Sequence, residues 1–369
     1  AANRHDQASR LSMASLAIGL GTGVLGALVL VLAARPIATL MGAQGELMEP
    51  TLTYLRIRAL AAPAVLCITA GNGVFRGYSD TRTPLFITLG LALLNLVGDL
   101  VFVLGFGWGI AGAAWATVGA QYAGALAFWV VLMGPGRRWF HIVPGWPGWA
   151  AVGRLLFVGS VMSIRTISLV GTLTVGTALA TRMGTVTIAA HQIASQLWML
   201  FALFIDALAL SAQILVAKHI GQGRAVVARE VSNRLLVIGT LFGVVFALAV
   251  WLGQPFWPWF FELEPPVTAA LFAVLPIVAL MQPLNAAVFV GDGIFMGARA
   301  FGWLAGVMVA TALVTGAAFA VSYLGGYGLV GLWWSIVVLI AARAIGLAVR
   351  WWGPWRLWRD AEERADSPA

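Results

Sequence analysis

Ten apolar segments, each long enough to cross a bilayer, constrain the fold of this chain more than any other feature. A helix of about 20 apolar residues spans the roughly 30 Å of bilayer hydrocarbon. The approximate spans are 11–34, 51–74, 84–104, 110–133, 154–180, 186–217, 233–253, 267–290, 302–324 and 328–349. Because lipid offers no hydrogen-bond partners, each span must satisfy its own backbone as a helix. The sequence therefore predicts an all-α polytopic membrane protein.

Composition agrees with this fold class and excludes several functions. The chain is 61% hydrophobic and 10% charged, whereas soluble domains have roughly 25% charged residues. Cys67 is the one cysteine, and the four histidines have no paired spacing, which argues against a disulfide framework or a dedicated metal centre. The sequence contains no Walker motif, nucleophile elbow or pair of catalytic carboxylates. We expect neither an enzyme nor a bound cofactor.

Basic residues predict the orientation of the spans. The net charge of +8 could indicate nucleic-acid binding. However, most of the 22 basic residues fall in one set of alternate loops and at both ends of the chain, while Arg35 and Arg182 fall in the opposite loops. Cytoplasmic loops carry such an excess of Lys and Arg. We therefore expect both termini in the cytoplasm and no nucleic-acid partner.

An internal repeat relates the two parts of the chain. Residues 71–77 (GNGVFRG) return as 291–297 (GDGIFMG), an offset of 220, and residues 109–112 return as 328–331, an offset of 219. The spans between 154 and 217 have no counterpart in the first part at this offset. We therefore expect an incomplete N-lobe of four helices over 1–140 and a C-lobe of six over 141–369 with a short cytoplasmic tail. About ten of twelve helices would be present, in lobes related by a pseudo-two-fold axis. The alternative is a natural ten-helix chain.

A first polar constellation lies in the spans at 84–104 and 110–133. Asn95 and Asp99 are four residues apart and share one helical face. A glycine-rich turn follows, and Thr117 returns at a similar depth in the next span. A carboxylate inside hydrocarbon costs about 2.5 to 3.5 kcal/mol, so it marks a functional site by default. The three residues are candidates for binding a proton or, as an alternative, Na⁺. The rival interpretation is an acid that helps to end a helix near the interface.

A second constellation follows helical spacing in the span at 186–217. Its polar members are Gln192, Gln196, Asp206 and Gln213, with His191 alongside. We expect this seam to face the interior of the bundle and to line a cavity, with Asp206 binding an ion or a cation. The alternative is hydrogen bonding between helices.

Other charged residues have structural interpretations. Arg165 lies inside a span and could pair with Asp206 or with a carbonyl group. Arg343 is near a cytoplasmic end, where a long side chain can snorkel. Two acid and arginine groups are expected to form turns and loop pairs: Asp80 with Arg76 and Arg82, and Asp292 with Arg299.

These residues resemble a known family. Asn95 and Asp99, with residues 105–114 (GFGWGIAGAA) and 116–117, resemble the fifth and sixth helices of MATE (multidrug and toxic compound extrusion) transporters of the DinF-like branch. Arg165 and Thr166, residues 189–193 (AAHQI) and residues 206–213 (DALALSAQ) resemble its seventh and eighth helices. The resemblance covers nearly the whole chain.

The resemblance implies a two-lobe bundle that exports amphipathic or cationic compounds by alternating access, driven by inward H⁺ or Na⁺. It assigns the coupling ion to Asn95, Asp99 and Thr117, and Arg165 joins the candidates for the substrate cavity. The family also uses an acid on its first helix, and that helix belongs to the pair that we expect to be missing from the incomplete N-lobe. We expect a monomer in the lipids of a bacterial inner membrane. The alternatives are a lipid-linked precursor flippase, which should show more basic residues in its cavity, and a membrane-embedded transferase.

Overall fold

The computed structural model describes residues 2–40, 45–134, 148–352 and 357–358, and these ranges contain helices and short turns but no strand. The chain divides into two compact units, Ala1–Phe157 and Val158–Ala369. The predicted domain boundary between 140 and 141 lies outside the described residues and stays a prediction.

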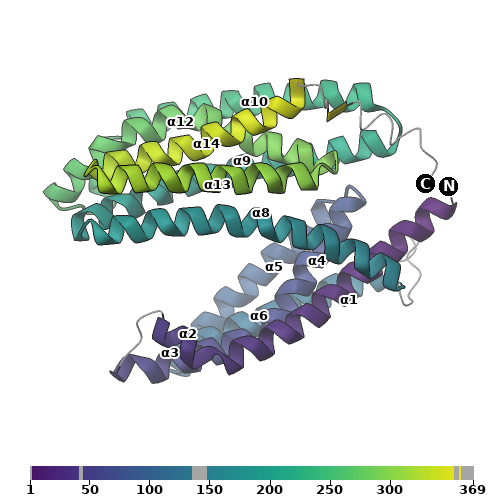
Figure 1. The fold of residues 1–369 in the computed structure, drawn as a ribbon. Coiled ribbons are helices and arrows are strands. Elements are labelled where there is room, and N and C mark those ends of the chain that lie inside the picture. Colours follow the sequence, from purple (N-terminus) through teal and green to yellow (C-terminus); the bar gives the residue numbers. More distant parts are fainter. Residues whose placement is uncertain (1, 41–44, 135–147, 353–356, 359–369) are drawn as a thin grey trace. The chain divides into compact units, whose positions relative to one another are not determined.

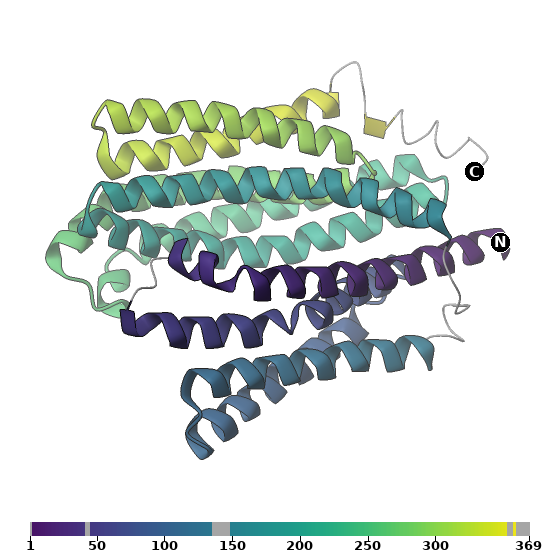
Figure 2. The ribbon, with the colours of Figure 1, turned by 60° about the horizontal axis from the view of Figure 1, so that its bottom comes forward.

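The first unit is built from two helix pairs. Helix α1 packs on α4, and α5 packs on α6 as an antiparallel hairpin (Figure 1 and Figure 2). The elements are α1 (Ala2–Leu32), α2 (Ala34–Leu40), η1 (Gly45–Leu47), α3 (Met48–Ala59), α4 (Ala62–Gly77), α5 (Arg82–Asp99), the π-helix η2 (Leu100–Gly105) and α6 (Gly109–Met133).

The second unit has a larger core with α12 at its centre. Helix α12 packs against α9, α10 and α14, and α13 lies beside α14 in both views (Figure 1 and Figure 2). The elements are α8 (Trp149–Arg182), which begins in the first unit, α9 (Thr185–Gly221), α10 (Ala225–Leu252), α11 (Phe256–Phe260), α12 (Pro265–Gly297), α13 (Phe301–Leu324) and α14 (Gly328–Trp352).

The predicted number of spans is confirmed. In the part of the chain that the structure describes, nine helices are long and apolar enough to cross a bilayer. The pair Gly45–Ala59 and Ala62–Gly77, bent by 43°, makes a tenth span when counted as one. The bend has a local cause, because Pro63 lacks the N–H that would bond the Ala59 carbonyl. The hydroxyl of Tyr122 donates to the Leu60 carbonyl at 2.9 Å, which satisfies another acceptor at the break.

The repeat is also visible in the fold. Helices α1 and α10 end at 32 and 252, and α4 and α12 end at 77 and 297, both at the offset of 220. The two repeats share a close approach between helices. A Cβ atom on Gly23 would lie 2.5 Å from Pro63 Cα, and one on Gly243 would lie 2.6 Å from Pro283 Cα. Helices α8 and α9 have no counterpart among the described helices of the first unit.

The predicted turn before α5 is present, but among the described residues Asp80 forms no ion pair with Arg76 or Arg82. One carboxylate oxygen of Asp80 accepts from the backbone N–H of Arg82 at 2.9 Å and of Thr83 at 3.1 Å, and the other accepts from the Thr83 hydroxyl at 2.7 Å. Partial burial alone would raise the pKa of Asp80, but these hydrogen bonds and the Arg82 charge together lower it. Asp80 therefore caps α5 as an ionised group.

Candidate functional site

The first candidate site begins with a direct bond between two predicted residues. The Asn95 side-chain amide donates to Asp99 Oδ2 at 2.7 Å, which confirms that the two share a helical face. The other oxygen, Asp99 Oδ1, is buried and has no hydrogen-bond partner among the described residues. Asp99 therefore keeps one acceptor for a proton or a cation.

The backbone changes geometry directly after Asp99. Helix α5 ends at this residue and widens into η2, where the Phe106 N–H donates to the Val101 carbonyl five residues back at 2.8 Å. Single turns of π-helix occur frequently at functional sites. The chain then reverses through Gly107 and Gly109, whose positive φ values of 68° and 52° favour glycine. Asp99 thus lies at the junction between the α-helix α5 and the π-helix η2, where the regular α-helical hydrogen bonding ends.

Thr117 lies at the expected depth but is bonded elsewhere. A Cβ atom on Gly98 would lie 2.9 Å from Ala116 Cβ, so α5 and α6 are in close contact one residue before Asp99 and one before Thr117. The Thr117 hydroxyl donates to the Ala113 carbonyl at 2.9 Å. The hydroxyl oxygen remains an acceptor or ligand, because a hydroxyl has two lone pairs.

Sequence reasoning missed a neighbouring polar pair. The guanidinium of Arg58, in α3, donates to Gln121 Oε1 at 3.1 Å. Gln121 is one helical turn after Thr117 on the same face of α6. The position of Arg58 inside a predicted span was the signal that could have identified it.

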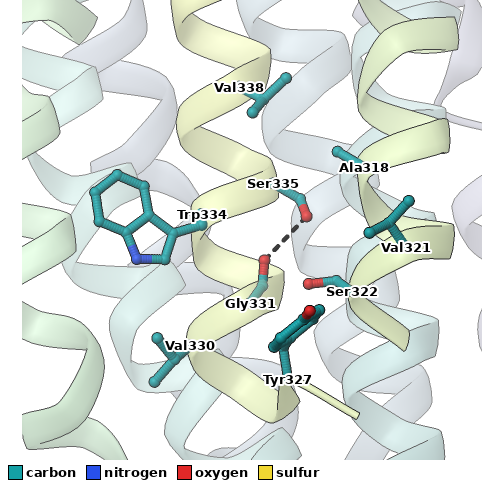
Figure 3. A pocket seen from close by; sticks show the side chains of 9 residues that line it. All are labelled: Ala318, Val321, Ser322, Tyr327, Val330, Gly331, Trp334, Ser335 and Val338. Atoms are coloured by element: carbon teal, nitrogen blue, oxygen red, sulfur yellow. Dashed lines mark hydrogen bonds between the residues drawn. The ribbon is translucent and has the colours of Figure 1, made fainter. Parts of the chain in front are cut away.

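The second unit carries an apolar counterpart of this site. Helices α13 and α14 start 219 residues after α5 and α6, so Ala318 corresponds to Asp99 and Val314 to Asn95. A cavity of about 470 Å³ lies here, with Ala318, Val321 and Val338 on its wall (Figure 3). The Ser335 hydroxyl is occupied by a hydrogen bond to the Gly331 carbonyl at 2.9 Å. Because this hairpin forms without an acid, the fold does not require one at Asp99.

The predicted seam on α9 does not face the interior of the bundle. Gln192, Gln196 and Asp206 are exposed and Gln213 is half-buried. The core-facing row of α9 consists instead of apolar residues such as Leu197, Phe201 and Ile205. The prediction of an inward seam is wrong, because the larger aliphatic and aromatic side chains of the same helix occupy the core.

His191 lies apart from this seam and is buried. Its Nε2 is 3.4 Å from the hydroxyls of Thr177 and Ser195, and its ring packs 5.7 Å from that of Trp333. His191 is therefore a core residue in contact with α8 and α14 rather than a residue on the exposed side of α9.

A buried ionic triad replaces the predicted roles of three other residues. Asp292 Oδ2 accepts from Arg165 and, at 2.6 Å, from Arg343. Asp292 does not form a cytoplasmic turn with Arg299, because it is buried within α12. Arg343 does not snorkel: it is 1% exposed and lies 5.1 Å from the centre of the Phe289 ring. Arg165 pairs with Asp292, not with Asp206 or a carbonyl.

Asp206 nevertheless belongs to the surroundings of this triad. The charges of Arg165, Asp292 and Arg343 all act on it. The rule that an ionisable residue within a span marks a functional site could have found the whole group. It failed here because Asp292 and Arg343 lie close to the predicted cytoplasmic ends of their spans, where turn formation and snorkelling offer simpler explanations.

Comparison with known proteins decides the family. A family model described as MatE matches residues 1–101 and 162–324, more than half of the chain. The chain belongs to the MatE family. The predicted resemblance is thereby confirmed. Family members are transporters and not enzymes, which leaves the membrane-embedded transferase without support.

Relatives of this MatE chain come from plants and bacteria. Protein DETOXIFICATION 43 of Arabidopsis thaliana is 33% identical over 96% of this chain and 67% of its own length. DNA damage-inducible protein F of Escherichia coli (strain K12) is 27% identical over 94% of this chain and 76% of its own length. The MatE chain thus spans about two thirds of the length of the plant relative. A multi-pass membrane protein is supported, while the bacterial inner membrane and cytoplasmic termini stay predictions.

Solved structures support the fold. A structure titled MATE in the bent conformation matches with a TM-score of 0.85 and 19% identity, over 98% of this MatE chain and 84% of that one. An outward-facing multidrug resistance MATE family transporter of the MOP superfamily matches with a TM-score of 0.86 and 19% identity, over 96% and 80%.

Proposed function

We propose that this MatE chain exports hydrophobic, cationic compounds by alternating access, in exchange for inward H⁺ or Na⁺. Family membership supports transport, and a Rhizobium meliloti relative, 27% identical, is named a probable multidrug resistance protein NorM. Moving one charge across 100 mV supplies about 2.3 kcal/mol, so one or two coupled ions can drive export.

The observation that carries ion coupling is the state of Asp99. Its Oδ2 is held by Asn95, while Oδ1 is buried without a partner among the described residues. A proton on Oδ1 would neutralise the carboxylate. Alternatively, Na⁺ would take the oxygens of Asp99, Asn95 and Thr117, which are ligands that hard cations prefer.

A substrate path is proposed along the exposed polar side of α9. Gln192, Gln196 and Asp206 are exposed within a span. Polar and charged side chains within spans face protein or water-filled cavities rather than lipid. His191 and Arg165 drop out as direct substrate contacts, since one is buried in the core and the other is paired with Asp292.

A lipid-linked precursor flippase is supported less well. Arg165 and Arg343, which lie within spans of the second unit, both bond Asp292. Their charge is therefore partly neutralised rather than free to bind a pyrophosphate. The monomeric state remains part of the proposal.

The test is dye efflux from vesicles containing the full chain, with imposed H⁺ or Na⁺ gradients. We expect Asp99→Asn to reduce ion-driven efflux to the rate of protein-free vesicles, because an amide neither takes up a proton near neutral pH nor supplies the negative charge that offsets a bound Na⁺. The control Glu264→Gln, an exposed acid before α12, should keep the parent rate. Unchanged efflux by the Asp99→Asn variant would contradict the coupling role of Asp99. The gradient that drives efflux in the parent chain, H⁺ or Na⁺, identifies the coupling ion.

A further inference from the structure

Four charged side chains of the second unit form one electrostatic cluster. They are Arg165 on α8, Asp206 on α9, Asp292 on α12 and Arg343 on α14. With both acids ionised, the two positive and two negative charges cancel. A change in the protonation of either acid would leave the cluster with a net positive charge inside the membrane.

Asp292 is not the member that changes its charge. Its carboxylate is 6% exposed and accepts from both guanidinium groups. Neutralising it would leave two buried cations without their shared partner, which is strongly unfavourable. Asp292 therefore has the structural role of holding α8 and α14 to α12.

Asp206 is in the opposite position. It lies near the middle of α9, is exposed, and receives no hydrogen bond or ion pair from the described residues. Helix α9 has no other titratable residue between His191 and Lys218, and α10 has none after Arg234. Helix α12 lies directly against α9 at this depth, because a Cβ atom on Gly293, next to Asp292, would collide with the backbone of Ala209, three residues after Asp206. The charges that bear on Asp206 are thus those of Asp292 and of its partners Arg165 and Arg343.

The arginines retain capacity to stabilise a second carboxylate. Arg165 Nε is buried without a hydrogen-bond partner among the described residues, and so are Nε and Nη1 of Arg343. Buried guanidinium donors that remain unbonded are costly. Their combined charge of two exceeds the single charge of Asp292, so the triad alone carries one surplus positive charge.

We propose that Asp206 is a proton-binding site of the second unit, separate from Asp99, and that Arg165 is the positioning residue that controls its affinity for the proton. Binding a proton takes the cluster from neutral to a charge of plus one, and releasing it restores neutrality. The inference builds on the ion coupling proposed above and adds a second carboxylate to it.

The first arm of the test measures proton binding without transport. Infrared difference spectra between low and high pH, taken on the full chain in lipid vesicles, report protonated carboxyl groups. We expect Asp206→Asn to lose one carboxyl signal and Asp206→Glu to retain a shifted one. Glu264→Gln is the control for an acid outside the cluster. A full set of signals in the Asp206→Asn variant would overturn the proposal.

The second arm measures the pH at which the infrared signal of Asp206 reaches half of its full change, here called the midpoint. Arg165→Gln leaves Asp292 paired with Arg343 but removes a positive charge near Asp206. The midpoint should rise by about one to three pH units, because a nearby opposite charge favours the ionised form by this amount. Arg165→Lys should restore most of the parent value. A purely structural Arg165 would leave the midpoint unchanged, which would contradict its assigned role.

These measurements separate the two proposals. An Asp206 signal in a chain that shows no ion-driven efflux would support the proton site and refute the proposed coupled export. Ion-driven efflux without an Asp206 signal would refute the proton site alone.

Discussion

Three carboxylates inside the spans differ in how their charge is compensated. Asp292 has two guanidinium partners, Asp99 has one amide, and Asp206 has no bonded partner among the described residues. Because an uncompensated charge inside a membrane is costly, Asp292 is best explained as structure and the other two as sites that bind an ion. At the residue scale, the hydrogen-bond and ion-pair partners of a carboxylate distinguish a structural role from ion binding better than its depth in the span does.

The triad makes a prediction about stability. Removing one partner of a buried ion pair costs about 3 to 5 kcal/mol, while replacing a whole group by apolar residues of similar size is often neutral. We expect Asp292→Ala to lower the thermal midpoint of the detergent-solubilised chain strongly. The triple variant with Arg165→Met, Asp292→Leu and Arg343→Met should recover most of the loss. Asp206→Ala, at an exposed and unbonded acid, is the matched control. Equal losses in Asp292→Ala and Asp206→Ala would contradict a special role for the triad.

Sequence could predict pairs within one helix but not partners on different helices. The four-residue spacing of Asn95 and Asp99 is enough to predict their contact, because helical geometry alone brings such residues together. The pairing of Arg165 with Asp292 joins residues 127 apart, and no local pattern specifies which span lies beside which. The inward seam on α9 was wrong for a related reason: helical spacing identifies a face, but packing against α10 and α12 decides which face is buried.

At the scale of elements, the repeated span has two forms. The first copy breaks into α3 and α4 next to Pro63, whereas the second continues as α12 through Pro276 and Pro283. The same close contact is nevertheless kept, Gly23 with Pro63 and Gly243 with Pro283. The offset in the sequence predicted this correspondence, but a proline alone does not determine whether a helix bends or breaks, since neighbouring groups can satisfy the freed carbonyls.

The glycine contacts lead to a prediction for both copies. A Cβ atom on Gly243 would meet the Gln282 carbonyl oxygen at 2.7 Å as well as Pro283 Cα, and backbone atoms cannot turn away as a side chain can. We expect Gly243→Ala and Gly23→Ala each to destabilise the chain by about 1 to 3 kcal/mol through overpacking. Gly306→Ala in α13 is the control, because a Cβ there meets no atom within 4 Å. Thermal midpoints of purified variants provide the measurement, and a loss for Gly306→Ala equal to the others would refute the packing argument.

At the scale of the whole molecule, the ten predicted spans and the distribution of charge predict one orientation. The turn before α5 carries Arg76 and Arg82 and belongs to the basic set of loops, while the connection before α12 carries Glu262 and Glu264. An even number of spans places both ends of the chain on the same side. The basic excess predicts that this side is the cytoplasm.

Labelling of single cysteines tests this orientation. Cys67 is the one native cysteine, so Cys67→Ser provides a background without thiols. On that background, Thr81→Cys and Glu264→Cys introduce thiols at exposed positions in opposite loops. We expect a membrane-impermeant maleimide added outside intact cells to label Glu264→Cys and to label Thr81→Cys only after the membrane is permeabilised. The Cys67→Ser background is the control for non-specific labelling. The reverse pattern would invert the orientation, and labelling of both thiols from outside would contradict the odd number of spans between them.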